Sequence, residues 1–485
     1  MDTHLLALQL MAAQGCLGAF DTLYHHEFTE ALPQRSTARR ELGIHAIRAL
    51  IYSALFIGLS AWSLHGAWAV VLLGLFGIEI VLTLWDFVVE DQTRLLPASE
   101  RVTHTILAIN GGAFIMLLLL NVPAWLAQPT AMQWEPHGWL SAFLCLCGIG
   151  VGLSGVRDGL ASLRISRREN EREFPGLRFG DAAESVLVTG ATGFIGQALV
   201  RALLAEGHQV TVLSRRPKQA AWLFGGKVHC IADMAELLPA ARIDVIVNLA
   251  GARILGWRWT ARRKEELRRS RIALTANLVA WIADAGRKPR LLLSASAIGY
   301  YGVQPQGDDR ELTEESSPQP VFMSQLCQDW EAAARAAAAH GVQVTCMRFG
   351  VVFGLQGALP MMLLPFRLGM GGRVGRGNQW QSWIHVQDVL RGIAHLWGLP
   401  AAPERFAAYN FTAPESVTQD QFSRVAARVL RRPCLLPTPA WPMRLALGEQ
   451  ADLLLEGQRV APARLQASGF AFSYPDLQGA LRNLC

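Results

Sequence analysis

The chain has 485 residues, which suits two or three domains, and 51% of them are hydrophobic while 17% are charged. The formal net charge is +6, and no basic stretch is interleaved with aromatic residues, so we expect no nucleic-acid partner. The eight cysteines show neither zinc-ligand nor disulfide spacing, which is typical of a protein in a reducing compartment.

The hydrophobic excess lies before residue 156, in apolar stretches that approach or reach the length of a membrane span. We predict an all-α transmembrane bundle over residues 1–155, followed by a linker over residues 156–184. The start of this linker can also be a helical continuation of the last span. The first and last stretches are short, and four spans remain if the first one lies in the membrane interface. The five predicted spans are Leu5–Phe20, Ile44–Leu64, Ala67–Phe87, Thr105–Leu126 and Trp139–Leu153.

Arginines occupy alternate connections of the five-span arrangement. Segments 1–4, 65–66 and 127–138 contain neither lysine nor arginine. The positive-inside rule therefore predicts an outside N-terminus and a cytoplasmic chain after residue 156, in a bacterial-type inner membrane. With four spans the N-terminus would lie inside. The arginines on the predicted inner side are Arg35, Arg39, Arg40, Arg48, Arg94, Arg101, Arg157, Arg164, Arg167 and Arg168.

Histidines and carboxylates gather at the predicted cytoplasmic ends of these spans. Glu41 precedes His45, and Glu100 precedes His104, at a spacing that puts each pair on one helical face. Such groups can hold a metal, a haem or a quinone between helices. They can equally form interfacial salt bridges and caps, so we assign no metal ligand from the sequence. The other members are Asp21, His25, His26, Glu27, Glu79, Asp86, Glu90 and Asp91.

A glycine-rich turn follows the short apolar strand predicted over residues 186–188. The glycines at 190, 193 and 196 let the backbone turn tightly and approach a pyrophosphate at the start of the next helix, predicted over residues 197–206. The pattern predicts dinucleotide binding by the backbone of this turn. The residues assigned to it are Gly190, Thr192, Gly193, Phe194, Ile195 and Gly196.

The next strand, over residues 210–213, ends in Ser214, Arg215 and Arg216. An acidic residue at this place would bind the ribose 2′-hydroxyl of NAD, whereas a basic end suits the 2′-phosphate of NADP. The sequence therefore predicts NADP as the cofactor.

Strands and helices continue to alternate along the second half of the chain, with a long helix predicted over residues 262–285. Such alternation predicts an α/β fold with a Rossmann-type, doubly wound parallel sheet. We place the NADP-binding domain at residues 185–400 and a C-terminal, substrate-side domain at residues 401–485.

Several motifs of residues 185–485 resemble the extended short-chain dehydrogenase/reductases, and within them an atypical, NADP-binding epimerase family with a C-terminal domain of unassigned function. They include Asn248-Leu-Ala-Gly251, Gly299-Tyr-Tyr-Gly302 and Arg348-Phe-Gly-Val-Val-Phe-Gly354. The resemblance does not cover the membrane part. It implies that Ser214 and Arg215 bind the 2′-phosphate, and that five further residues line the cofactor. These are Leu249, Ala250, Glu266, Arg271 and Val352.

The usual proton relay of the wider group, Tyr-x₃-Lys, is absent. Phe322 and Leu326 occupy the tyrosine and lysine places, and no lysine follows Lys288. Ser296 and Tyr301 remain as candidate catalytic residues near the expected nicotinamide. Ser296 can alternatively bond the backbone at the strand end, and Tyr301 can form a substrate-side wall.

These observations predict a membrane-anchored, NADP-dependent oxidoreductase or epimerase-like enzyme acting on a small or lipidic compound. The missing relay favours an alternative, a non-catalytic module that senses NADP(H) for a membrane process. A glycine- and arginine-rich stretch over residues 364–381 suits an anionic substrate group or a mobile lid. His385 and Asp388 either orient a substrate or have a structural role. The oligomeric state stays open.

Overall fold

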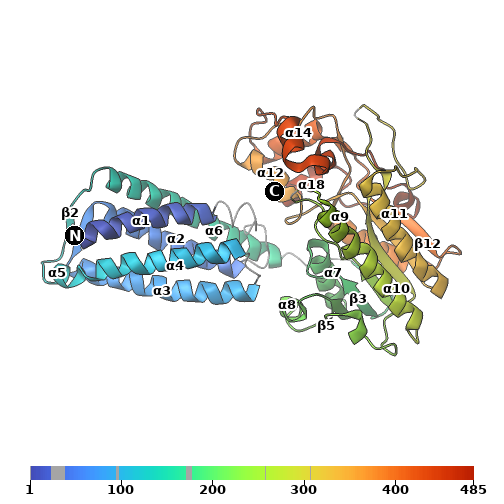
Figure 1. The fold of residues 1–485 in the computed structure, drawn as a ribbon, viewed down its shortest axis with the longest axis horizontal. Coiled ribbons are helices and arrows are strands. Elements are labelled where there is room, and N and C mark those ends of the chain that lie inside the picture. The colour runs from blue at the N-terminus through green and yellow to red at the C-terminus, as the bar shows by residue number, and fades with distance from the viewer. Residues whose placement is uncertain (1, 23–38, 94–97, 171–176, 257, 306) are drawn as a thin grey trace. The chain divides into compact units, whose positions relative to one another are not determined.

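The computed structural model describes residues 2–22, 39–93, 98–170, 177–256, 258–305 and 307–485. The chain divides into two compact units, residues 1–172 and residues 173–485. We call them the helical unit and the sheet unit and describe each by itself (Figure 1).

In the described part of the helical unit, five helices are long and apolar enough to cross a membrane by length and composition. The helix predicted to end at residue 153 continues to residue 170, so the linker begins with the helical continuation that the sequence left open. Apolar side chains such as Val156, Leu160 and Leu163 continue the helical pattern there, and no proline interrupts it. The five helices are α1 (Thr3–Phe20), α2 (Arg39–Ser60), α3 (Ala67–Thr93), α4 (Ala98–Leu119) and α6 (Trp139–Asn170).

Helices α1 and α4 run antiparallel to each other, and so do α2 and α6. The Thr3 hydroxyl donates to Asn121 Oδ1 at 3.2 Å, which places the start of α1 beside the end of α4. The Ser162 hydroxyl donates to the Arg39 carbonyl at 2.9 Å, which places the end of α6 beside the start of α2. Helix α6 approaches α2 through small residues, since a Cβ added at Gly155 would lie 2.8 Å from the Ala49 Cβ.

Two short strands and a short helix close one end of the helical unit. Strands β1 (Trp62–His65) and β2 (Ala131–Trp134) pair antiparallel, and α5 (Val122–Leu126) lies between α4 and β2 in the chain. The Gly66 N–H donates to the Trp125 carbonyl at 2.9 Å. The three arginine-free segments of the sequence therefore meet at the same end of the unit.

Large apolar side chains cover the outer faces of α3, α4 and α6. Val81 and Leu84 are both 62% exposed, Ile109 is 69% exposed and Leu153 is 68% exposed. Monomeric soluble proteins rarely expose contiguous apolar surface of this kind.

The sheet unit is built on a seven-stranded sheet in the order β12-β8-β7-β6-β3-β4-β5, with every neighbouring pair parallel. The predicted Rossmann-type sheet is therefore confirmed. The strands are β3 (Ser185–Thr189), β4 (Gln209–Leu213), β5 (His229–Ile231), β6 (Val245–Asn248), β7 (Leu291–Ala297), β8 (Gln343–Phe349) and β12 (Phe406–Phe411).

Strand β12 corrects the domain boundary that was predicted at residue 400. It pairs with β8 along its whole length, from Phe406 opposite Val344 to Phe411 opposite Phe349. The sheet thus ends after residue 411, because its edge strand comes from the segment assigned to the C-terminal domain.

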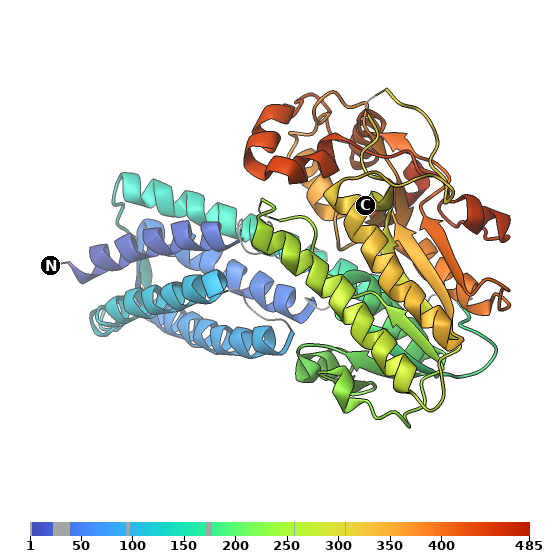
Figure 2. The same cartoon turned by 45° about the vertical axis from the view of Figure 1, so that its right-hand side comes forward.

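Helices cover both faces of the sheet. Leu199 of α7 (Phe194–Ala205) and Val389 of α13 (Val386–Gly398) join the core on one face. Leu278 of α10 (Leu274–Asp284) and Ala334 of α11 (Phe322–Arg335) join the core on the other face, where the two helices lie side by side (Figure 2). The helix predicted over residues 262–285 is interrupted, since a π-helical turn, η5 (Arg269–Ala273), separates α9 (Ala261–Arg268) from α10.

The remaining elements form a smaller subdomain with a core of its own. Phe353 and Trp383 stack within this core at a centroid distance of 5.4 Å. Two short strand pairs contribute to it, β9 (Val351–Phe353) with β11 (Trp383–His385) and β10 (Trp380–Gln381) with β13 (Val417–Thr418). Its helices are α12 (Leu359–Arg367), α14 (Gln419–Leu430), α15 (Ala440–Leu447), α16 (Asp452–Leu455) and α18 (Leu477–Leu484). Helix α17 (Ala463–Ala467) instead joins the main sheet core through Leu465.

Candidate functional site

The glycine-rich turn joins β3 to α7 at the carboxyl end of the sheet. Gly190 has a φ of +68° and lies against the neighbouring strand end, so an added Cβ would be 2.7 Å from the Leu249 carbonyl carbon. A Cβ at Gly196 would lie 2.2 Å from the Gly190 carbonyl oxygen. Thr192 and Gly193 are exposed at the tip. The turn therefore leaves the N-terminus of α7 open, as phosphate binding requires.

Phe194 and Ile195 begin α7. The Phe194 ring packs on the segment after β9, since a Cβ at Gly354 would lie 2.3 Å from its Cζ. Val352, in the middle of β9, pairs with Ile384 and packs at the edge of the main core. The structure thus brings the glycine turn and the Val352 segment together.

The end of β4 presents the predicted phosphate-binding residues. Ser214 is half-buried and its Oγ accepts a hydrogen bond from the Arg216 backbone N–H at 3.2 Å. Arg215 and the Glu266 side chain of α9 are exposed. A hydrogen bond from Arg263 lowers the pKa of Glu266, and the charge of Arg215 acts in the same direction.

Leu249 and Ala250 are half-buried at the end of β6, and the buried Arg271 lies beside them. Arg271 Nη2 donates to the Ala252 carbonyl at 2.9 Å, and a Cβ at Gly251 would lie 3.0 Å from the guanidinium carbon. Burial lowers the pKa of Arg271. Arg271 therefore contacts and holds the backbone that follows β6. The resemblance implies that the cofactor lies beside this same backbone.

Buried hydrogen bonds connect the ends of three central strands. The Thr189 hydroxyl donates to Asn248 Oδ1 at 2.7 Å. Asn248 Nδ2 donates to Ser294 Oγ at 3.2 Å and to Thr275 Oγ1 at 2.9 Å. Asn248, Thr189 and Ser294 are fully buried. The motif that begins at Asn248 marked this strand end in the sequence, but the network itself was not predicted.

A second buried network contains both predicted catalytic residues. Arg348 of β8 and Glu331 of α11 form a bidentate ion pair, with both N–O distances 2.8 Å. The Ser296 hydroxyl donates to Glu331 Oε1 at 2.7 Å, while Arg348 Nη1 donates to the Tyr301 hydroxyl oxygen at 3.0 Å. Tyr301 in turn donates to Asn410 Oδ1 at 2.7 Å. The two predicted residues thus meet through one ion pair.

This network holds Ser296 and Tyr301 away from solvent, with exposed fractions of 3% and 1%. Burial raises the pKa of Tyr301 to about 12, although Arg348 opposes this shift. A phenol with such a pKa is poorly matched to proton exchange at neutral pH. The neighbouring Tyr300 is half-buried, and its ring centroid lies 3.4 Å from the Arg348 guanidinium carbon. Of these three hydroxyl residues, Tyr300 is the most accessible.

The side chains at the positions of the missing relay, Phe322 and Leu326, also have apolar neighbours in the structure. Leu326 is buried among Leu267 and Met323. The Phe322 ring packs edge-on against Trp259, with centroids 5.4 Å apart, and Lys264 Nζ lies 4.8 Å from its centroid.

His385 and Asp388 are placed by the fold in structural roles. His385 Nδ1 accepts from the Gln387 N–H at 3.1 Å and caps α13, and burial lowers the pKa of His385 to about 4. Asp388 accepts from the backbone N–H groups of Ser473 and Tyr474, both at 2.8 Å.

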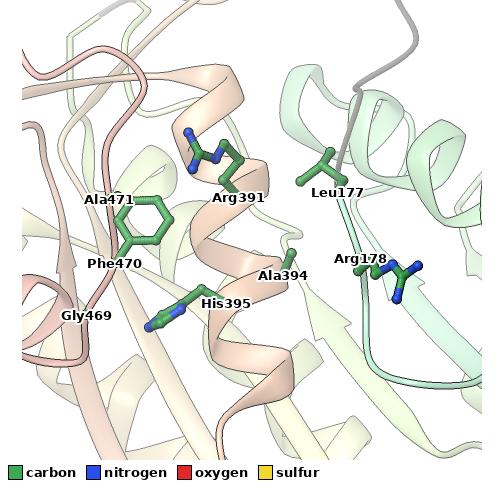
Figure 3. A pocket seen from close by; sticks show the side chains of 8 residues that line it. All are labelled: Leu177, Arg178, Arg391, Ala394, His395, Gly469, Phe470 and Ala471. Atoms are coloured by element: carbon green, nitrogen blue, oxygen red, sulfur yellow. The ribbon is translucent and has the colours of Figure 1, made fainter.

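A shallow pocket of about 340 Å³ lies between α13, residues 177–178 and residues 469–471 (Figure 3). His395 and Phe470 line it, and Arg178 points away from the Phe470 ring. The pocket contains none of the predicted site residues.

A parallel sheet with helices on both faces and a glycine turn at its first helix defines the Rossmann-type nucleotide-binding proteins. The NAD dependent epimerase/dehydratase family matches residues 186–411, and a domain of unknown function, DUF1731, matches residues 438–484. The chain belongs to this epimerase family, which confirms the resemblance seen in the sequence.

Relatives in this family come from distant organisms. The epimerase family protein YfhF of Bacillus subtilis is 38% identical over 304 residues, which are 62% of this chain and 97% of that protein. The chloroplastic SDR39U1 homolog of Arabidopsis thaliana is 38% identical over 306 residues, which are 61% of this chain and 86% of that protein.

A solved structure is also similar. The crystal structure of human epimerase family protein SDR39U1 with NADPH has 35% sequence identity and a TM-score of 0.54. It covers 62% of this chain and 98% of the human chain. NADPH is thus the nucleotide bound to that human relative.

Proposed function

We propose that the sheet unit binds NADP(H) and acts as an oxidoreductase or epimerase-like enzyme. The observation that carries the proposal is the open glycine turn at the start of α7, with Arg215 exposed at the end of β4. The turn offers backbone N–H groups and the helix dipole to a pyrophosphate, and Arg215 offers a cation to a 2′-phosphate. The NADPH bound to the human relative supports this assignment.

Replacing Arg215 with alanine is expected to weaken NADPH binding by ~1–3 kcal/mol, through the loss of charge-assisted hydrogen bonds. NADH binding should hardly change, because NADH has no 2′-phosphate. Fluorescence titration of the purified full-length protein with each nucleotide measures both affinities. Arg242→Ala is a matched control, since this exposed arginine precedes β6 at the amino ends of the parallel strands, whereas Arg215 follows β4 at their carboxyl ends. Equal losses for both nucleotides would contradict the role of Arg215.

We propose further that α1, α2, α3, α4 and α6 span a membrane, with residues after 170 in the cytoplasm of a bacterial-type cell. Length, composition and exposed apolar side chains of these helices support the proposal. The described arginines also support it. Arg39 and Arg101 lie in the first turns of α2 and α4, Arg48 lies in the first half of α2, and Arg157 lies in the second half of α6.

Cysteine accessibility tests this topology in a cysteine-free background. Single cysteines at the exposed positions Asp2, Ala67 and Gln128 are expected to react with an impermeant reagent from outside, whereas one at Leu160 is expected to be protected. A protected residue 2 would mean four spans. A reactive residue 160 would refute the cytoplasmic placement of the sheet unit.

For the chemistry, we propose that Tyr300 is the hydroxyl nearest to a bound substrate. Its partial exposure and its stacking on Arg348 distinguish it from the buried Ser296 and Tyr301. A lipidic substrate is supported by exposed apolar residues of the smaller subdomain, where Leu435 and Leu436 accompany Met370. These three side chains are 78%, 55% and 52% exposed, and both leucine N–H groups donate to the Gly371 carbonyl.

The second candidate function is NADP(H) sensing without turnover. It is favoured by the apolar Phe322 and Leu326 at the relay positions, and by the structural bonding of Ser296 and Tyr301. Under this alternative, the bound nucleotide would regulate a membrane process or a partner protein.

Variants expressed in cells that depend on this protein distinguish an enzyme from a sensor. An enzyme is expected to lose its function with Tyr300→Phe even though the variant still binds NADPH. A sensor is expected to keep its function with Tyr300→Phe and lose it with Gly193→Asp, which removes nucleotide binding. A screen for NADPH oxidation by carbonyl compounds complements this comparison, and turnover of any of them would exclude the sensor.

A further inference from the structure

A buried group of histidines and carboxylates lies in the helical unit, where α2 and α4 begin and α3 ends. Glu41 of α2 is fully buried, and Glu90 of α3 is 1% exposed. His45 follows Glu41 by one helical turn, so both side chains face α3. The group belongs to neither family match, since those begin at residue 186.

The distances in this group are slightly longer than those between ligands of one ion. The coordinating atoms of Glu41, His45 and Glu90 all lie within 4.8 Å of one another. His45 Nε2 is 3.7 Å from Glu90 Oε1 and 3.0 Å from Asp86 Oδ2. Two atoms that are each about 2.1 Å from one tetrahedral ion lie roughly 3.4 Å apart. A small shift of these side chains would therefore close a coordination sphere.

A second imidazole orients the Glu90 carboxylate from its other side. His104 Nδ1 lies 3.2 Å from Glu90 Oε2, and His104 Nε2 lies 3.2 Å from Asp21 Oδ2. Glu90 thus directs one oxygen to each histidine. Outer-shell polar contacts to ligating carboxylates hold them in place around protein-bound metals.

Asp86, which contacts His45, is an independent sign of a ligand site because one of its carboxylate oxygens has no partner within the described residues. Its Oδ2 accepts from Arg48 and His45, and its exposed fraction is 3%. Its Oδ1 is buried and has no hydrogen-bond partner within the described residues. Buried polar atoms usually find a partner, and this one belongs to a side chain that contacts His45.

We propose that Glu41, His45 and Glu90 bind one divalent first-row metal ion, of the class Mn²⁺, Fe²⁺ or Zn²⁺. Two carboxylates and an imidazole suit these borderline and hard cations and do not suit soft Cu(I). A bound ion also offsets the cost of burying two carboxylates within a helix bundle. The site ties α2 to α3.

Cobalt binding tests the site, with Co²⁺ as a spectroscopic substitute for these ions. Full-length protein in detergent is stripped with a chelator and titrated with Co²⁺, and bound metal is measured by its visible absorption and by mass spectrometry. Wild-type protein is expected to bind about one ion per chain. Glu90→Gln and His45→Ala should each weaken binding at least about tenfold.

Glu79→Gln is the matched control and is expected to bind Co²⁺ like the wild type. Glu79 is a buried carboxylate on the same helix, but it accepts hydrogen bonds from Tyr52 and Thr83, at 3.0 and 2.7 Å. Circular dichroism and gel filtration check that each variant is folded, and Glu41→Gln replaces any that is not. A wild-type protein that binds no Co²⁺, or a folded Glu90→Gln variant with wild-type affinity, would overturn the proposal.

Discussion

Replacing Gly193 with aspartate is expected to lower the affinity for NADPH by about a hundredfold or more, which corresponds to about 2.7 kcal/mol. Gly193 is exposed and immediately precedes α7. An aspartate there would direct its carboxylate to the place where we expect the cofactor's pyrophosphate, so two negative charges would compete for one helix N-terminus.

The fold should tolerate this substitution. The backbone of Gly193 has φ −79° and ψ 173°, which any residue adopts. Gly193→Ala serves as the control, because it adds a Cβ 3.2 Å from the Gly190 carbonyl oxygen without adding charge. We expect the alanine variant to lose less than about tenfold in affinity. Calorimetric titration with NADPH distinguishes the two, and equal affinities would refute the phosphate-binding role of the turn.

Removing one member of the Glu331–Arg348 pair is expected to destabilise the sheet unit by about 3–5 kcal/mol. Glu331→Ala leaves the guanidinium of Arg348 buried, with an exposed fraction of 4%, and without the carboxylate that accepts its two 2.8 Å hydrogen bonds. It also removes the acceptor of the Ser296 hydroxyl. In a unit of this size we expect the melting temperature to fall by roughly 10 °C.

Thermal unfolding of the detergent-purified protein, followed by tryptophan fluorescence, measures this loss. Glu265→Ala is a surface control on α9 and should stay within about 0.5 kcal/mol of the wild type. The double variant Glu331→Leu with Arg348→Met is expected to be more stable than Glu331→Ala, because it leaves no buried charge unpaired. An unchanged melting temperature of Glu331→Ala would contradict the structural role of the pair.

The long apolar helices and the glycine turn could be predicted from the sequence because each depends on local pattern. A long apolar run predicts a helix of spanning length, and the glycines at 190, 193 and 196 predict a tight turn wherever a strand precedes them. Helix ends were less predictable. Helix α6 extends to Asn170 because the polar residues at its end are compatible with a helix. No proline marks the predicted boundary at residue 156.

Contacts between residues far apart in the sequence could not be predicted. Ser296 and Tyr301 were selected by motif, but Glu331 and Asn410, which hold them, lie 35 and 109 residues away. The edge strand β12 was assigned to the wrong domain for the same reason, since its pairing with β8 leaves no signal in local composition. His25 and His26, considered as metal ligands, lie outside the described residues.

The sequence by itself determined the class of nucleotide-binding fold, the basic end of β4 and the apolar character of the first 155 residues. These properties follow from the order of residues along single elements. Only the tertiary structure decided which polar groups are buried together, because burial depends on how elements pack rather than on their periodicity. It separated the accessible Tyr300 from the buried Tyr301 and brought Glu90 between His45 and His104. In a buried site every charge needs a partner, and the fold supplies that partner from elsewhere in the chain.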